Sequence, residues 1–228
     1  MARKIIGGVF LSLDGVMQAP GGPEEDPTGG FAHGGWLTTV FDEELGAEID
    51  HLFDREYDLL LGRRTYDIFA AHWPFMPQDE SDPDASIAVG FAKARKYVLT
   101  RSDRELEWEG SHRLSDMDAL AALKAENGPD LIIQGSSTLY PQLLERGLLD
   151  RVTLMIAPVV LGGGKRLFGD GTPPCALRMI EHRLSRNGIA MATYEPAGPL
   201  ADSGSFATPE EPSAQERARR QAMAEGRW

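Results

Sequence analysis

Residues 130–168 read DLIIQGSSTLYPQLLERGLLDRVTLMIAPVVLGGGKRLF. The apolar run Leu131–Ile133 is typical of a strand that is buried on both faces of a parallel sheet. After a turn of small residues, the pattern predicts a helix from near Thr138 to about Gly147, and then a strand over Asp150–Val160. Such a turn leaves backbone N–H groups free at a helix N-terminus, where anions commonly bind. The stretch therefore predicts an α/β protein and favours a phosphate-bearing ligand, while a purely steric reason for the small residues stays open.

The length and composition are those of one substantial globular domain with a tail. The chain has 228 residues, of which 42% are hydrophobic and 25% are charged. We expect a domain over residues 1–197 and a polar tail over residues 198–228 that is mobile or packed on a partner. No apolar run approaches the ~20 residues that span a bilayer, and the N-terminus lacks a signal-peptide pattern. A cytoplasmic protein without membrane contact is therefore expected.

The charge and the cysteine count argue against several kinds of site. The net charge of −12 argues against nucleic-acid binding, which needs a basic face. Cys175 is the only cysteine, so neither an intrachain disulfide nor a cysteine-based zinc site is expected, and we predict no metal. A phosphate ligand on so acidic a protein requires a few well-placed arginines.

Arginines follow two further predicted strands, Tyr57–Leu61 and Lys96–Leu99. The first strand leads into GRRT at a predicted helix start, and the second leads directly into TRS. The planar fork of an arginine suits a phosphate, and a helix N-terminus adds partial positive charge. The candidate ligand-binding residues at these strand ends are Gly62, Arg63, Arg64, Thr65, Thr100, Arg101 and Ser102. An exposed basic pair and a plain turn are the respective alternatives.

The first predicted strand, Lys4–Leu13, and the loop after it supply the candidate substrate-binding groups. Asp14 follows the strand, where open α/β sheets place ligands, although Asp14 and its neighbouring glycine can also form a simple turn. The segment Gln18–Trp36 is rich in glycine and proline and has no periodicity, which favours a binding loop or lid. Trp36 is a candidate for ligand contact within it. A surface insert is the alternative.

The remaining predicted elements complete an alternating α/β pattern. Asp42 is expected to cap a helix electrostatically rather than to face a substrate, and Ser115 is expected to be an N-cap. The dipeptide Asn187-Gly188 predicts a hairpin turn. These elements are helices over residues 42–53, 62–71, 87–95, 115–127 and 209–223, an extended piece over 106–112, and a closing hairpin of residues 177–184 and 189–194.

The motifs SLDG, LLLGRRTY, VLTRS, LIIQGSSTLYPQLL and LDRVTLMIAPVVLGGG occur in one order along the chain. This ordered set resembles the dihydrofolate reductase-like superfamily, and most closely the reductase domain of the bifunctional riboflavin-biosynthesis deaminase-reductase, over about residues 3–195. The resemblance implies a three-layer αβα fold with a central, mostly parallel sheet and a C-terminal antiparallel hairpin. It also implies NADPH as the cofactor and a homodimer as the assembly.

The resemblance assigns cofactor-binding roles to residues of three motifs. Gly62–Thr65 match the helix start that binds the cofactor phosphates, and Thr100–Ser102 match the turn near the adenine ribose and its 2′-phosphate. The third motif matches the turn under the pyrophosphate and nicotinamide, and its residues here are Gln134, Gly135, Ser136, Ser137, Thr138 and Leu139. Gln134 stands where dihydrofolate reductases have the first glycine of a pair. A deaminase zinc site is not expected on a single cysteine.

We therefore predict an NADPH-dependent reductase of a small pterin- or aminopyrimidine-like substrate. Asp14 is the predicted substrate-side acid, and Trp36 is predicted to stack on the substrate when its loop closes. A non-catalytic dinucleotide-binding module, acting as a sensor or a scaffold, is the main alternative. A flavin-binding reductase is a further one.

Overall fold

The computed structural model describes residues 2–79, 81–82, 85–204 and 211–227. The chain divides into two compact units, residues 1–198 and residues 199–228. The second unit contains helix α6 (Ala214–Ala224), which begins after the capping residue Ser213 and has no buried residue. The predicted start of this helix, Pro209, lies outside the described residues.

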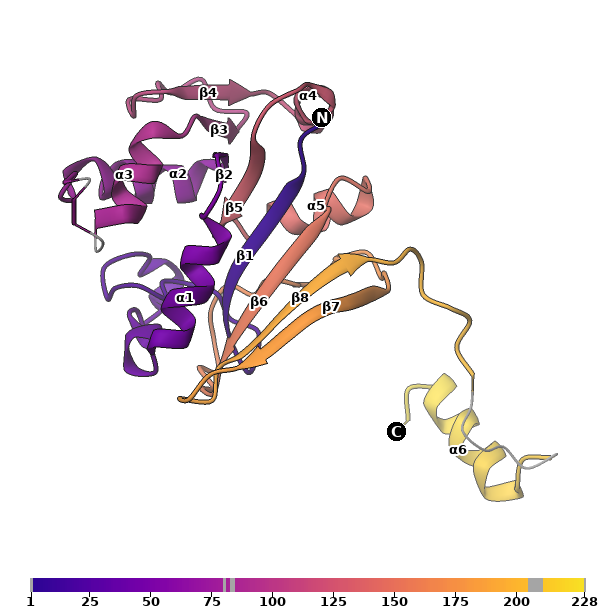
Figure 1. Cartoon of the computed structure of the whole chain (residues 1–228). Helices are drawn as coiled ribbons and strands as arrows, with labels where there is room; N and C mark the ends of the chain where they lie inside the picture. Colours follow the sequence, from indigo (N-terminus) through magenta and orange to yellow (C-terminus); the bar gives the residue numbers. More distant parts are fainter. Residues whose placement is uncertain (1, 80, 83–84, 205–210, 228) are drawn as a thin grey trace. The chain divides into compact units, whose positions relative to one another are not determined.

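The first unit is built on one sheet of eight strands in the order β4-β3-β2-β5-β1-β6-β8-β7 (Figure 1). The strands from β4 to β6 in this order are parallel to their neighbours, while β8 and β7 form an antiparallel hairpin beside β6. The predicted mostly parallel sheet with a C-terminal antiparallel hairpin is thus confirmed. The strands are β1 (Ile5–Ser12), β2 (Tyr57–Gly62), β3 (Lys96–Leu99), β4 (Ser111–Leu114), β5 (Asp130–Gln134), β6 (Arg151–Ala157), β7 (Leu177–Leu184) and β8 (Ala190–Pro196).

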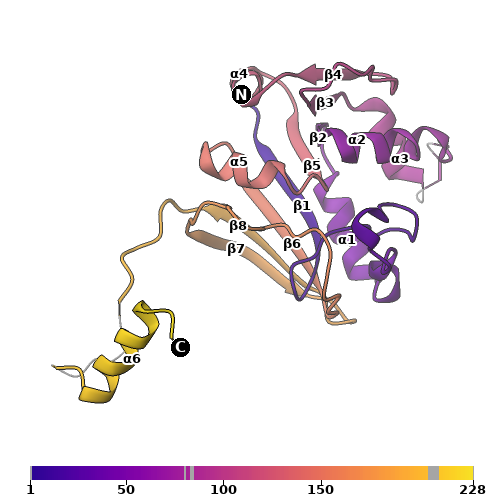
Figure 2. The same ribbon diagram turned by 180° about the vertical axis from the view of Figure 1, so that it is seen from behind.

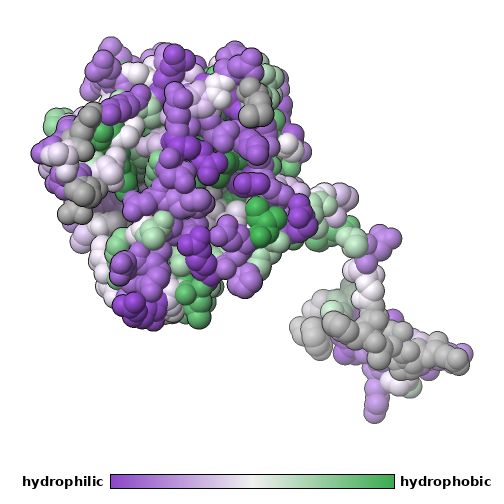
Figure 3. Space-filling model, in the orientation of Figure 1, coloured by the Kyte–Doolittle hydropathy of each residue, from purple (hydrophilic) through white to green (hydrophobic). Residues whose placement is uncertain are grey.

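Helices cover both faces of the sheet, as the two opposite views in Figures 1 and 2 show. Apolar side chains of α4 and α5 form one core with β1, β3 and β5, whereas those of α1, α2 and α3 pack on the opposite face. The α-helices are α1 (Glu43–Leu52), α2 (Arg63–Ala70), α3 (Ser86–Lys93), α4 (Met117–Ala125) and α5 (Leu139–Glu145), and short 3₁₀ helices span Thr28–Gly30, Trp36–Thr39 and Trp73–Phe75. The side chains visible in Figure 3 are mostly hydrophilic on this unit.

Two adjacent glycines let β1 pass between α5 and α1. A Cβ atom on Gly7 would lie 2.6 Å from the hydroxyl oxygen of Tyr140, and one on Gly8 would lie 2.3 Å from Cδ2 of Leu52. Since successive residues of a strand face opposite sides, one glycine admits α5 and the other admits α1. Helix side chains therefore approach the backbone of β1 closely at both glycines.

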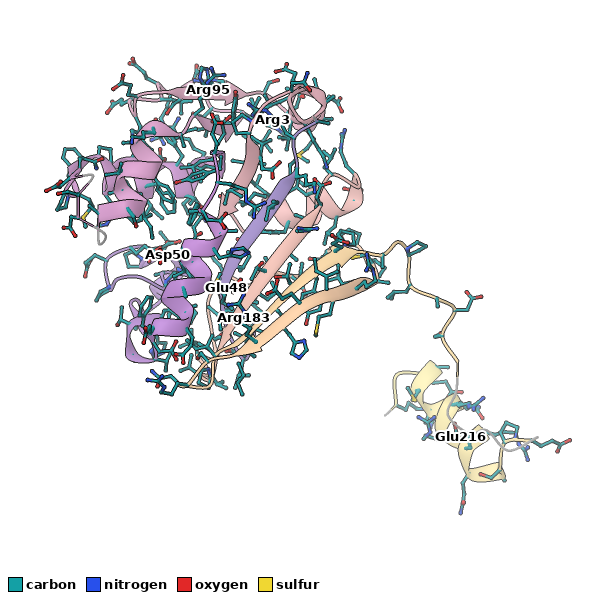
Figure 4. The ribbon with its side chains drawn as sticks, in the orientation of Figure 1. Arg3, Glu48, Asp50, Arg95, Arg183 and Glu216 are labelled. Atoms are coloured by element: carbon teal, nitrogen blue, oxygen red, sulfur yellow. The ribbon has the colours of Figure 1, made fainter. Side chains whose placement is uncertain are left out.

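Polar contacts also hold α1 against the hairpin of β7 and β8, beginning at the N-terminal end of the helix. Asp42 caps the helix by accepting a hydrogen bond from the backbone of Leu45 at 3.0 Å, as predicted, and it also accepts one from Asn187 at 2.8 Å. Further along the helix, Glu48 points toward Arg183 of β7, with a separation of 3.6 Å (Figure 4). These contacts fix the helix that forms one wall of the cavity described below.

Three predicted boundaries differ from the structure for local reasons. The strand predicted to reach residue 160 ends at Ala157, because Pro158 lacks the N–H that a ladder requires. Helix α4 is capped by Asp116 rather than Ser115, since the Asp116 carboxylate accepts from two backbone N–H groups of the first turn. The predicted extended piece 106–112 pairs only from residue 111 onward, because the Trp108 backbone N–H donates to the Tyr66 hydroxyl instead of to a strand.

Candidate functional site

A cavity of about 1360 Å³ opens at the carboxyl ends of β2 and β5. Its polar side is formed by the turns 62–65 and 134–138, and its apolar side by side chains of α1, α2 and α3 such as Ile49 and Phe69. The loop 17–28 and Lys165 close a further side. The cavity therefore offers anion-binding groups next to an apolar surface, which is a common combination in cofactor sites.

Reciprocal hydrogen bonds join the two polar turns. The backbone N–H of Gly62 donates to Oγ of Ser136 at 2.9 Å, and the backbone N–H of Ser136 donates to Oγ1 of Thr65 at 3.0 Å. Gly135 and Ser136 both adopt the left-handed conformation, with φ values of 74° and 57°. Ser136 is thus a non-glycine residue in a conformation that is uncommon for its type. The structure brings together the predicted residues of β2 and β5 at one site.

The backbone of this turn retains unused donors. Among the described residues, no acceptor is found for the N–H groups of Ser137 and Thr138. These groups and the N-terminus of α2, an eight-residue helix, face one cavity. Free backbone donors and a helix N-terminus together favour an anionic group such as a phosphate.

The two arginines after β2 have different roles. Arg63 donates to the Asp67 carboxylate at 2.8 Å and to the backbone oxygen of Arg104 at 3.0 Å, so its guanidinium ties α2 to the segment after β3. Arg64 is exposed and lines the cavity, and within the described part of the chain it has no hydrogen-bonding or ionic partner. Arg64 is therefore the arginine available to a ligand.

The third predicted strand end, residues 100–102, follows β3, which lies next to β2 in the sheet. Thr100 is buried, and its Oγ1 accepts the backbone N–H of Ser102 at 3.1 Å. Arg101 is exposed and, like Arg64, has no partner among the described side chains. These residues share the sheet edge with the cavity but do not line it, and neither does Leu139, which packs in the core.

The loop expected to act as a lid is instead tied down by buried polar contacts. The Gln18 side chain donates to the backbone oxygens of Asp26 and Thr28 at 2.8 and 2.9 Å and accepts from the backbone N–H of Lys165 at 3.0 Å. The Lys165 ammonium pairs with the Asp26 carboxylate. Trp36 is only 5% exposed, and its indole N–H donates to the Gln18 backbone. The structure thus places Trp36 in the core, where it cannot stack on a ligand in the cavity.

Asp14 also lies apart from the cavity lining. Its carboxylate accepts hydrogen bonds from the backbone N–H groups of Leu161 and Gly162, at 3.0 and 2.9 Å, and from the Ser12 hydroxyl at 2.7 Å. These donors, the backbone of Leu161 first among them, lower the pKa of Asp14 to about 2. The contacts indicate that Asp14 fixes the loop after β6 to the end of β1.

Replacing Asp14 with asparagine is expected to lower the free energy of unfolding by about 1–2 kcal/mol at pH 7, because the lowered pKa reports favourable contacts of the ionised carboxylate. A lowered pKa gives stability that is complete above the unfolded-state value and is lost as pH falls through the folded-state value. The difference between wild type and Asp14→Asn should therefore shrink between pH 4 and about pH 2. Urea unfolding at several pH values measures it, and an unchanged stability at pH 7 would contradict this role.

Several cavity residues were not predicted from the sequence. Glu25 lines the cavity, and its Oε2 accepts from the Gly21 backbone at 2.7 Å. Burial is the main cause that raises the pKa of Glu25 above its usual value. Lys165 and the apolar wall around Phe53 and Trp73 were also missed. The glycine- and proline-rich loop gives no periodic signal by which Glu25 could have been singled out.

Neither a metal centre nor a membrane span is found in the part of the chain that the structure describes. No group of three or more histidine, cysteine, aspartate or glutamate side chains is arranged to hold a metal ion there. Over the same residues, every helix is too short or too polar to cross a bilayer.

Comparisons with known proteins agree on the family and the fold. Residues 3–191 match the RibD C-terminal domain. The uncharacterized protein YyaP of Bacillus subtilis is 25% identical over 194 residues, which cover 84% of this chain and 94% of YyaP.

Two solved structures share the fold at low sequence identity. The diaminohydroxyphosphoribosylaminopyrimidine deaminase/5-amino-6-(5-phosphoribosylamino)uracil reductase of Thermotoga maritima superposes with a TM-score of 0.56 and 13% identity, over 86% of this chain and 57% of that enzyme. Dihydrofolate reductase from Enterococcus faecalis, complexed with NADP(H), gives a TM-score of 0.53 and 13% identity over 86% of this chain and 99% of the other.

Proposed function

This chain belongs to the RibD C-terminal domain family, and we propose that it is an NADPH-dependent reductase of a small pterin- or aminopyrimidine-like heterocycle. The observation that carries the proposal is the pair of reciprocal hydrogen bonds between Gly62, Thr65 and Ser136. These bonds bring a helix N-terminus and a turn with free N–H donors to one cavity. The riboflavin-type reductase and the dihydrofolate reductase with the same fold support the choice of reaction class.

The residues present fit a phosphate-rich dinucleotide. The N-terminus of α2 with Arg64, and the turn 135–138, would hold the pyrophosphate, because both offer donors that the protein itself leaves unused. Arg101 and Ser102, on the neighbouring strand end, would hold the 2′-phosphate. When bound, NADPH supplies the hydride, and the protein supplies position and electrostatics.

The rest of the cavity suits a flat heterocycle. Phe53, Phe69 and Trp73 provide an apolar wall that excludes water from a bound ring. The Glu25 carboxyl lies in the same cavity and retains its proton to higher pH than an ordinary glutamate, since burial raises its pKa. It would hold a proton that a reduced ring nitrogen can accept.

The proposal includes a homodimer that forms through the outer strands. Hydrophobic side chains of β7 are exposed, with Met179 at 49%, Ile180 at 38% and Leu184 at 73%. Exposed apolar side chains on an edge strand suit contact with a second copy. Light scattering coupled to size-exclusion chromatography should give twice the mass of one chain, and a monomeric mass would contradict this part.

The function is tested by measuring binding and then turnover. NADPH is titrated into the protein while tryptophan fluorescence is followed, since Trp73 lines the cavity. A panel of oxidised pterins and aminopyrimidines is then added, and loss of NADPH absorbance reports hydride transfer. We expect saturable NADPH binding and oxidation with at least one member of the panel. Binding without turnover across the panel would favour a non-catalytic dinucleotide-binding module, and no binding would contradict both functions.

A further inference from the structure

Gln134 lines the cavity, and its side-chain amide has an unused hydrogen-bonding atom. Gln134 is the last residue of β5 and lines the cavity beside the anion-binding turn. Its Oε1 atom is buried and has no hydrogen-bond partner, and its Nε2 atom donates to no described residue. Arg3 and Glu44 also have buried side-chain atoms without a partner, but neither residue lines the cavity.

A glycine on the neighbouring strand β1 leaves space for the Gln134 amide. Gln134 lies opposite Gly8 of β1 in the sheet register. A Cβ atom on Gly8 would lie 3.6 Å from Oε1 of Gln134 and 2.3 Å from Cδ2 of Leu52. The glycine therefore keeps the space between α1 and the sheet narrow and apolar, with the Gln134 amide at its edge.

An amide without hydrogen-bond partners at this place is unfavourable unless a bound ligand supplies the missing hydrogen bonds. A buried acceptor without a partner is destabilising, because it has lost its hydrogen bonds with water. A ligand that donates to Oε1 and accepts from Nε2 removes this cost with two hydrogen bonds in one plane. Because the amide can rotate by half a turn, the pairing works in either order.

We propose that the Gln134 amide reads an amide edge, an adjacent C=O and N–H, on a ring bound in this cavity. A glutamine side chain pairs with the donor–acceptor edge of adenine by the same two-point geometry. Two groups of the proposed reaction carry such an edge: the lactam of a pteridine or pyrimidine substrate, and the carboxamide of the nicotinamide. The inference rests on the proposed function and adds the group that selects the ring.

Gln134→Met tests the inference, because methionine keeps the length and removes both polar atoms. Four ligands are titrated: NADPH, 2′-phospho-ADP-ribose, which lacks the nicotinamide, and lumazine and an N-methylated lumazine, the last two with protein saturated with NADP⁺. We expect the substitution to weaken at least one amide-bearing ligand tenfold or more. Loss for NADPH alone, with 2′-phospho-ADP-ribose unchanged, identifies the carboxamide. Loss for lumazine, with the N-methylated ring unchanged, identifies the substrate.

Controls separate this inference from folding and from the proposed function. Gln134→Met should unfold at the same temperature as wild type or higher, since it removes an unpartnered polar atom. Gln134→Glu, which replaces the donor with a carboxylate oxygen and adds a negative charge, is a second variant for the same titrations. Gln221→Met, the same exchange at an exposed position of α6, should leave all four affinities within twofold. Unchanged affinities in Gln134→Met overturn the inference alone. Wild-type protein that binds none of the four ligands overturns the proposed function as well.

Discussion

Replacing both Arg64 and Arg101 with alanine is expected to weaken NADPH binding at least 100-fold, and to weaken it at least tenfold more than NADH binding. A hydrogen bond between an arginine and a phosphate contributes about 1.5–3 kcal/mol, and each 1.4 kcal/mol is a factor of ten in affinity. NADH lacks the 2′-phosphate, so it loses only the contacts that Arg64 makes with the pyrophosphate. Isothermal titration calorimetry with both cofactors measures the two ratios.

The expected loss of NADPH affinity is large because few positive side chains are available to bind the cofactor phosphates. The net charge of −12 disfavours an anionic ligand, so local arginines must provide the attraction. Arg64 and Arg101 have no partners among the described residues, whereas Arg63 is occupied by Asp67. Replacing Arg63 should therefore affect stability more than the preference for NADPH.

A control variant distinguishes specific contacts from a general change of charge. Arg186, at the turn of the closing hairpin, is 76% exposed, with its nearest acidic group at 3.5 Å. Arg186→Ala should change both affinities less than twofold. Equal losses for NADPH and NADH in the double variant would refute the assignment of the 2′-phosphate to Arg101.

Gly135→Val is expected to abolish measurable NADPH binding, with at least a 100-fold loss, and to lower the free energy of unfolding by about 2–4 kcal/mol. Gly135 has a φ of 74°, which a β-branched residue strongly disfavours. A Cβ atom there would also lie 3.0 Å from Cγ2 of Thr65, the residue whose hydroxyl accepts the Ser136 N–H. The substitution therefore pushes the two turns apart. Urea unfolding and fluorescence titration measure the two effects.

Substitutions at two other glycines separate the effect of backbone strain from the effect of the contact with Thr65. Gly147 has a φ of 62° with open space around its Cβ position, so Gly147→Val reports backbone strain alone, about 1–2 kcal/mol. Gly163 has open space and no positive φ, so Gly163→Val should be close to neutral. NADPH affinity in both controls should stay within twofold of wild type. If Gly135→Val binds NADPH as these controls do, the turn does not hold the cofactor.

The parts of the fold that depend on local patterns were predictable. The apolar run Leu131–Ile133 identifies a buried strand, and the dipeptide Asn187-Gly188 identifies the hairpin turn. The meeting of the turns after β2 and β5 at one site was also predictable, because the carboxyl ends of neighbouring parallel strands share one edge of the sheet. What sequence could not show is that the backbone N–H of Ser136 donates to the Thr65 hydroxyl across 71 positions of the chain.

The environments of Asp14 and Trp36 were not predictable for the same reason. Asp14 looked like a substrate acid at a strand end, but its partner Leu161 lies 147 positions away. Trp36 lies at the end of a loop without periodicity, and its burial depends on Gln18 and on apolar side chains of later strands. Long-range contacts of this kind are fixed only when the strand order is known.

The polar network of Gln18, Asp26 and Lys165 also affects the rate at which a ligand binds in the cavity. Side chains of the protein itself hold this wall in place. An arriving ligand therefore spends little of its binding free energy on arranging backbone, which is the advantage of a preorganised receptor. Encounter by diffusion, rather than a slow rearrangement of the loop, should then limit the rate of association.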